Sequence, residues 1–174
     1  LESPGGATLS DGDTDGDGDF DVLYHYGSRS FTIYDLAGNL VFDSGATFSQ
    51  LVAEIRPDLF NTSNGTSADG RSDDKGVEPE AIAAGQVGDK TYAFIGLERD
   101  SGIMVFDISN PTAPTFEQYI DSAQNGNISP ETIAFVAAED SPTGNAQIAI
   151  AYEGDGATVV YDLTENFDIL EVTA

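Results

Sequence analysis

Short apolar runs recur along the whole chain, and each is broken by Gly, Asn, Asp or Pro. Runs of about four to eight residues with such boundaries are typical of strands and turns rather than helices. Residues 47–55 are the exception, because their apolar positions share one face at helical spacing, which predicts a short helix. The clearest predicted strands cover residues 91–96, 103–108, 147–152 and 157–163.

These runs belong to a unit that the sequence repeats. In the second unit a Pro-Glu pair at Glu80 opens one run, and the next run ends at Glu98. In the third unit Glu131 and Glu153 hold the same two places. The first unit matches this repeat pattern less closely, and its predicted strands include residues 7–9 and 22–26. Four strands in a period of roughly 40 to 55 residues are typical of a β-propeller blade.

We therefore predict an all-β fold in which residues 1–174 form one segment of a β-propeller. Each blade would have four antiparallel strands. The three predicted blades cover approximately residues 4–55, 79–120 and 130–172, and a polar surface insertion covers residues 56–78. Propellers usually have about four to eight blades. We therefore expect the remainder of the propeller, or another chain, to complete a larger ring.

Charge and composition narrow the classes of function. The chain has 31 Asp and Glu residues against 6 Lys and Arg residues, a net charge of −25, which repels nucleic acids and attracts cations. There is no Cys, so a disulfide framework or a thiolate site is excluded. No apolar run is long enough for a membrane span. A G-x-S-x-G motif is absent, so serine-hydrolase chemistry has no support.

An aspartate-rich stretch near the start carries a carboxylate at every second residue. In a looped backbone such carboxylates converge on one hard cation, and calcium is the natural occupant. Two registers of the pattern D-x-D-x-D-G-x-x-D fit, and we favour the one that ends at Asp21, because a predicted strand follows directly. An EF-hand is excluded, since Val22 or Tyr24 stands where it needs Glu. The candidate ligands are Asp11, Asp13, Asp15, Asp17, Asp19 and Asp21.

A second acidic site is predicted from blade topology. The loop that enters the first strand of a blade lies on the same face as the loop that joins the second strand to the third, so the repeated glutamates should gather at one mouth of the ring. Converging carboxylates suit calcium or another hard divalent cation, and a metal with cationic side chains suits phosphate-ester chemistry. The alternative is that these glutamates only satisfy backbone amides at crowded turns. The candidate residues are Glu80, Glu98, Glu131, Glu153, Asp73, Asp74 and Arg99.

Several longer stretches resemble the choice-of-anchor I family. They are residues 71–80, 91–99 and 102–107, together with residues 17–21 and 27–31. The resemblance implies a bacterial protein, secreted or attached to the cell surface, that contains a propeller. Some relatives are labelled alkaline phosphatases, and residues 75–80 are loosely similar to phytase-like propellers. The family motif often reads Pro-Glu-Gly, whereas this chain has Ala81 and Thr132 at the third position, which weakens the transfer of a catalytic role.

Two hypotheses about function follow. In the first, the chain is an extracellular calcium-binding propeller module with a binding, surface or scaffold role. In the second, it is a calcium-dependent phosphoric ester hydrolase, similar to alkaline phosphatase or phytase, with an acidic site at the propeller mouth. Calcium is the expected cofactor in both.

Overall fold

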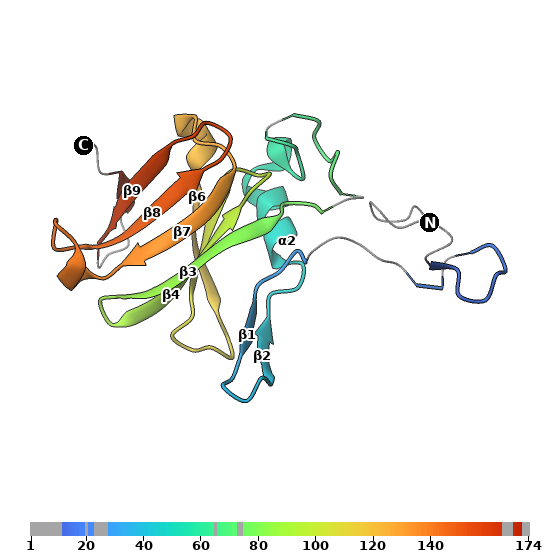
Figure 1. The fold of residues 1–174 in the computed structure, drawn as a ribbon, viewed down its shortest axis with the longest axis horizontal. Coiled ribbons are helices and arrows are strands. Elements are labelled where there is room, and N and C mark those ends of the chain that lie inside the picture. The colour runs from blue at the N-terminus through green and yellow to red at the C-terminus, as the bar shows by residue number, and fades with distance from the viewer. Residues whose placement is uncertain are drawn as a thin grey trace.

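The computed structural model describes residues 12–19, 21–22, 28–64, 66–72, 75–164 and 169–171. Its described part is mostly β-structure, with three antiparallel sheets and the helix α2 (Thr47–Ile55) (Figure 1). The all-β prediction is therefore confirmed, and so is the short helix. None of the described helices has the length and apolar character needed to cross a membrane.

The first sheet pairs β1 (Thr32–Tyr34) with β2 (Leu40–Asp43). The second sheet has the order β3 (Pro79–Val87), β4 (Lys90–Leu97), β5 (Gly102–Asp107), β6 (Thr115–Asp121). The third sheet runs through β7 (Pro130–Val136), β8 (Ala146–Tyr152), β9 (Thr158–Leu163) and β10 (Ile169–Glu171). Short 3-10 helices are η1 (Pro57–Leu59), η2 (Ser122–Asn125) and η3 (Ala138–Asp140).

The second and third units thus each form a four-stranded sheet, as predicted. In both sheets strands that are consecutive in the sequence lie side by side, and alternate residues of each strand face opposite sides of the sheet. For the first unit the structure describes only β1 and β2 as strands. Its predicted strand at residues 7–9 lies outside the described residues, and so does all but Val22 of the one at 22–26. The closed ring stays a prediction.

The second sheet lies between two hydrophobic cores. Phe94, Ile103 and Val105 face the third sheet, where they pack with Ile148, Ile150 and other apolar residues. Ala93, Ile95 and Phe106 face the first sheet and α2. Both faces of the second sheet are therefore covered, which explains why most of β4 and β5 is buried.

The insertion at residues 56–78 lies partly on the surface, where residues 57–58 and 66–70 are exposed, and partly inside the protein. Asn61, Thr62, Val77 and Glu78 are buried in it. The Glu78 carboxylate pairs with Arg71, Lys75 and Arg99. The Asn64 N–H donates to the Arg99 carbonyl oxygen at 3.0 Å, which joins this segment to the residues that follow β4. The polar side chains of this segment therefore divide into a group that pairs inside the protein, around Glu78, and a group that faces water, which includes Asp58 and Asp69.

Candidate cation sites

Two β-bulges place the repeated Pro-Glu residues. In the second sheet Pro79 pairs with Leu97 and Ala81 with Gly96, so Glu80 is an extra residue without a partner on β4. In the third sheet Glu131 is the extra residue between Pro130 and Thr132 in the same way. A bulge bends the strand and redirects the side chain of the extra residue. Both glutamates are exposed at the start of their strands.

The other repeated glutamates come directly after the second strand of each unit. The Glu98 N–H donates to the Glu78 carbonyl oxygen at 2.8 Å, and the Glu153 N–H donates to the Ser129 carbonyl oxygen at 2.8 Å. Glu78 and Ser129 both precede a proline and both have positive φ, 51° and 60°. Positive φ is uncommon for residues other than glycine. The same unusual backbone is therefore built twice, once in each sheet.

These four glutamates, together with Glu78, form what we call the glutamate cluster. Carboxylate oxygens of Glu98, Glu131 and Glu153 lie within 4.8 Å of one another, and those of Glu78, Glu80 and Glu98 do so as well. Glu98 belongs to both groups and is buried, with 3% of its surface exposed. The structure therefore brings together all four glutamates that the blade topology predicted to converge.

Cationic side chains gather on the Glu78 side of the cluster. Glu78 is 2% exposed and accepts a contact from Arg71 Nη2 and one from Lys75 Nζ at 3.0 Å. Arg99 Nε lies 3.6 Å from Glu78 Oε1, and Arg99 Nη2 lies 2.8 Å from Glu98 Oε1. A buried carboxylate needs such partners, since an unpaired one would carry a large desolvation cost.

Burial and neighbouring carboxyl groups raise the pKa of two glutamates of the cluster, Glu98 and Glu131. Burial raises the pKa of Glu98, Arg99 partly opposes this, and Glu80 and Glu153 raise it further. Desolvation also raises the pKa of Glu131, with Glu153, Glu80 and Glu98 adding to the effect. A bound divalent cation would reverse these shifts, because it favours the charged form of each ligand.

The aspartate-rich stretch folds into a second group, which we call the aspartate loop. Carboxylate oxygens of Asp13, Asp15 and Asp21 lie within 4.8 Å of one another. Asp13 accepts hydrogen bonds from the Gly16 N–H at 2.6 Å and the Gly18 N–H at 3.0 Å. Asp21 accepts from the Thr14 hydroxyl at 2.7 Å, and hydrogen bonds from Thr14 lower its pKa. These hydrogen bonds fold the backbone of the loop around the carboxylates of Asp13 and Asp21.

Comparison with known proteins places the chain in a family. The choice-of-anchor I domain model matches residues 6–111, which include the aspartate loop, Glu80 and Glu98. The chain belongs to the choice-of-anchor I domain family. It is also 27% identical over 167 residues to Gigasin-3a from Magallana gigas, an alignment that covers 83% of this chain and 59% of that protein. In the comparison with solved structures, none matches.

Within this choice-of-anchor I domain the remaining predicted residues are placed as follows. Arg99 lies at the glutamate cluster as predicted. Asp17 and Asp19 are exposed on the aspartate loop but stand outside the group of three that includes Asp21. Asp21, which belongs to this group, is the last ligand in the register that the sequence favours. Predicted residues outside the described part of the chain are Asp11, Asp73 and Asp74.

Blade topology also brings Glu78 to this mouth with the end of the insertion, but the sequence does not identify it as the buried centre of the cationic contacts. Its signal in the sequence is its place one residue before Pro79, but Ser129 precedes Pro130 in the matching unit, so the repeat does not mark Glu78. Only the three-dimensional contacts with Arg71, Lys75 and Arg99 reveal its role.

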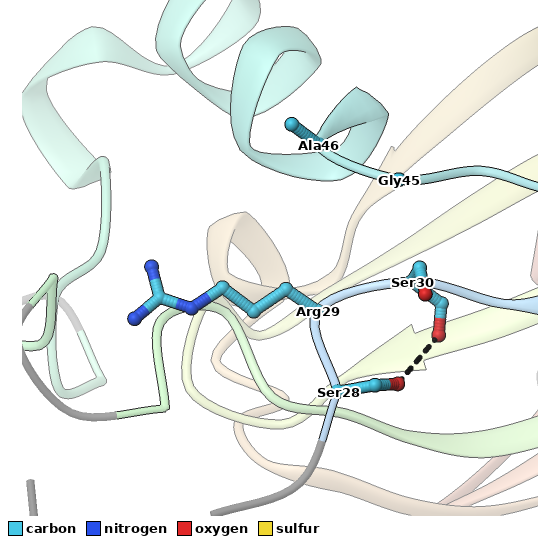
Figure 2. A pocket seen from close by; sticks show the side chains of 5 residues that line it. All are labelled: Ser28, Arg29, Ser30, Gly45 and Ala46. Atoms are coloured by element: carbon cyan, nitrogen blue, oxygen red, sulfur yellow. Dashed lines mark hydrogen bonds between the residues drawn. The ribbon is translucent and has the colours of Figure 1, made fainter. Parts of the chain in front are cut away.

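An open pocket of about 340 Å³ lies between residues 28–30 and the start of α2, and it is lined by Ser28, Arg29, Ser30, Gly45 and Ala46 (Figure 2). Figure 2 shows Ser28 donating to the Ser30 carbonyl oxygen, at 3.1 Å, while the Arg29 guanidinium points away from both serines. Arg29 Nη2 donates to the Ser72 carbonyl oxygen at 2.6 Å. Arg29 therefore holds the insertion in place.

Proposed function

We propose that this choice-of-anchor I domain is a calcium-binding module, with one cation at the glutamate cluster and one in the aspartate loop. The convergence of the repeated glutamates carries the proposal. Blade topology alone would put these strand ends on one face, but it would not by itself bring their carboxylate oxygens so close together. Here the oxygens of Glu98, Glu131 and Glu153 come from two sheets and lie within 4.8 Å of one another.

The charge of the glutamate cluster supports a divalent cation. Its five carboxylates face three cationic side chains, which leaves two negative charges for one bound ion to neutralise. Calcium takes about six to eight oxygen ligands in flexible geometry and accepts carboxylates in either one-oxygen or two-oxygen mode. Glu80, Glu131 and Glu153 are exposed enough to adjust to such an ion.

For the aspartate loop we propose Asp13, Asp15 and Asp21 as ligands. Each contributes an oxygen within 4.8 Å of the others, and the hydrogen bonds to Gly16, Gly18 and Thr14 orient these carboxylates in advance. Asp17 and Asp19 are adjacent and exposed, so they can supply further oxygens. A calcium ion here would fix this loop within the first unit.

The second candidate, a calcium-dependent phosphoesterase at the mouth, is supported less well. Such an enzyme needs cationic side chains that stabilise the charge of the phosphoryl group. Arg71, Lys75 and Arg99 lie beside the cluster, but each contacts the buried carboxylate of Glu78. The contacts therefore favour binding over hydrolysis.

We infer further that the module works outside the cell and that its sheets belong to a larger propeller ring. Membership in the family and the net charge of −25, which is screened in saline media, support this location. The chain spans 59% of the length of Gigasin-3a.

Calorimetric titration of calcium into chelator-treated protein tests the proposal. We expect two classes of site. The pair Asp15→Asn and Asp21→Asn should remove one class, and the pair Glu98→Gln and Glu153→Gln should remove the other. Glu139→Gln, an exposed change in η3, serves as the control. Hydrolysis of a generic phosphomonoester by the wild type, lost with Glu80→Gln and Glu98→Gln, would instead support the phosphoesterase.

A further inference from the structure

Arg99 links the two parts of the glutamate cluster. Its Nη2 lies 2.8 Å from Glu98 Oε1, which is a hydrogen-bond distance, whereas its Nε lies 3.6 Å from Glu78 Oε1, too far to donate. Nε is also buried, and none of the described residues accepts a hydrogen bond from it. A buried donor without a partner costs free energy. The guanidinium is therefore bound well to Glu98 and poorly to Glu78.

Glu98 is also the carboxylate on which the proposed calcium site depends. It is buried and belongs to both groups of converging carboxylates, including the one that it forms with Glu131 and Glu153. The Arg99 guanidinium occupies Oε1 of this residue. A positive charge so close to a ligand oxygen repels a divalent cation, and the hydrogen bond takes an acceptor position that the ion could use. Arg99 and calcium therefore compete for the same carboxylate.

The matching turn of the third unit carries no such cation. One residue after the repeated glutamate, the Arg99 N–H donates to the Val77 carbonyl oxygen at 3.4 Å. In the third unit the Gly154 N–H donates to the Ile128 carbonyl oxygen at 3.2 Å from the same position. A Cβ at Gly154 would lie 2.5 Å from Ile128 Cγ1, so that turn admits no side chain there. The guanidinium is thus an addition to a turn that both units share, and the turn itself does not require it.

We propose that Arg99 is an internal competitor of calcium at the glutamate cluster, and that calcium binding transfers its guanidinium from Glu98 to Glu78. This exchange presupposes the calcium site proposed above and describes how that site is regulated. The movement it needs is small, because a shift of less than about 1 Å brings Nε within hydrogen-bond distance of Glu78 Oε1. The orphan donor of the calcium-free protein would then gain its partner.

The exchange keeps the buried carboxylates neutralised in both states. Without calcium, Arg99 compensates the charge of Glu98, which burial would otherwise make costly. With calcium, the ion compensates Glu98, and Arg99 joins Arg71 and Lys75 at Glu78. Displacing the guanidinium costs part of the binding free energy of calcium. The site should therefore fill at higher calcium concentrations than the same carboxylates would without Arg99.

Calorimetric titration of calcium tests this role in the full chain that carries Asp15→Asn and Asp21→Asn, which leaves the glutamate cluster as the proposed site. Two variants are added to this parent. Arg99→Gln removes the competing charge, and Arg99→Lys keeps it. The control is Lys90→Gln, which removes the same charge at the other end of β4, where Lys90 is 51% exposed.

Arg99→Gln should lower the dissociation constant for calcium at least about tenfold, because it removes a positive charge a few ångströms from the ion. Arg99→Lys and Lys90→Gln should stay close to the parent. If Arg99 were merely structural, Arg99→Gln would lower the melting temperature in chelator without tightening calcium. Unchanged or weaker binding by Arg99→Gln, or equally tight binding by Arg99→Lys, would overturn the exchange and leave the calcium site standing. Calcium binding by neither the parent nor Arg99→Gln would overturn the site itself and the exchange with it.

Crystals of the unsubstituted chain grown with calcium give a test that does not depend on the folding of a variant. We expect Arg99 Nε at about 2.7–3.2 Å from a Glu78 carboxylate oxygen, a hydrogen-bond distance, and Nη2 no longer bonded to Glu98. A structure in which calcium lies at the glutamate cluster while Arg99 keeps its contact with Glu98 would overturn the exchange.

Discussion

At the scale of single residues, Glu78 and Glu80 show that two like side chains two positions apart can have opposite environments. Glu78 has positive φ and turns inward to meet Arg71, Lys75 and Arg99. Glu80 is the extra residue of a bulge and is directed outward, with its side chain 40% exposed. The backbone conformation therefore decides which carboxylate is structural and which is available to a ligand.

Glu78→Gln should lower the free energy of unfolding by about 3 kcal/mol, because removing one partner of a buried ion pair leaves the other charges uncompensated. Glu80→Gln, the matched control, should change it by less than about 1 kcal/mol, since its ion pair with Lys75 is exposed and long. Urea unfolding in chelator measures both. Equal losses for the two variants would show that Glu78 is not the centre of the network.

Asp100 should make the calcium-free protein less stable as the pH rises. Burial raises its pKa to about 6, although a hydrogen bond from the Tyr119 hydroxyl partly lowers it. A carboxyl group whose pKa is higher in the folded than in the unfolded protein makes its full contribution to stability at a pH below the unfolded pKa, which is near 3.8. This contribution is lost as the pH rises to about 6. The loss amounts to about 3 kcal/mol, because a tenfold change in proton affinity corresponds to about 1.4 kcal/mol.

Asp100→Asn tests this dependence, because it keeps an acceptor for Tyr119 but cannot ionise. Chemical unfolding between about pH 4 and pH 7, across the range in which carboxyl groups of raised pKa titrate, should show a flatter profile for the variant. Parallel profiles for the variant and the wild type would assign the pH dependence to other carboxyl groups, such as Glu98 and Glu131, whose pKa values are also raised.

At the scale of elements, close contact between the second and third sheets depends on Gly85. Phe135 lies where a Cβ at this position would be, within 2.4 Å of ring atoms. The rings of Phe94 and Phe135 stack beside it, with centroids 6.2 Å apart. The glycine lets β3 and β7 approach, and this approach helps to bring Glu80 and Glu131 to the same end of the two sheets.

Gly85→Val should lower the free energy of unfolding by about 1–3 kcal/mol, because overpacking displaces the Phe135 ring. The neighbouring Ala84→Val, at an exposed position, should change it by less than about 0.5 kcal/mol. Phe135→Leu in the Gly85→Val background should recover part of the loss. If the second substitution makes the loss larger instead, the two residues are not in steric conflict.

The strands could be predicted from the sequence because their alternation and their turn residues are local properties. The convergence of Glu98 and Glu153 was also predictable, since topology alone puts those strand ends on one face. The burial of Glu78 was not, because it depends on cationic partners at other positions in the chain. The bulges at Glu80 and Glu131 depend on pairing with a neighbouring strand, which a single sequence does not specify.

At the scale of the whole molecule, a net charge of −25 makes stability depend on cations in two ways. Monovalent salt screens the general repulsion, whereas calcium would bind at defined sites and stabilise by mass action. In chelator, raising sodium chloride from about 0.01 M to about 0.5 M should raise the melting temperature, because the Debye length falls several-fold.

Calcium at about 1 mM is far too dilute to screen the charge. It should raise the melting temperature by more than sodium chloride does at the same ionic strength. The pair Asp15→Asn and Asp21→Asn should remove part of this calcium response and leave the sodium response. A calcium effect no larger than that of magnesium chloride at equal ionic strength would assign it to screening alone.

Anomalous diffraction from crystals grown with calcium tests the role of the glutamate cluster most directly, because it locates the ion instead of inferring it. We predict an anomalous peak within coordination distance, about 2.3–2.6 Å, of carboxylate oxygens of Glu98, Glu131 and Glu153, and a second peak at Asp13, Asp15 and Asp21. A map with a peak in the aspartate loop and none among the glutamates would contradict the proposed cation site and make the glutamates turn residues.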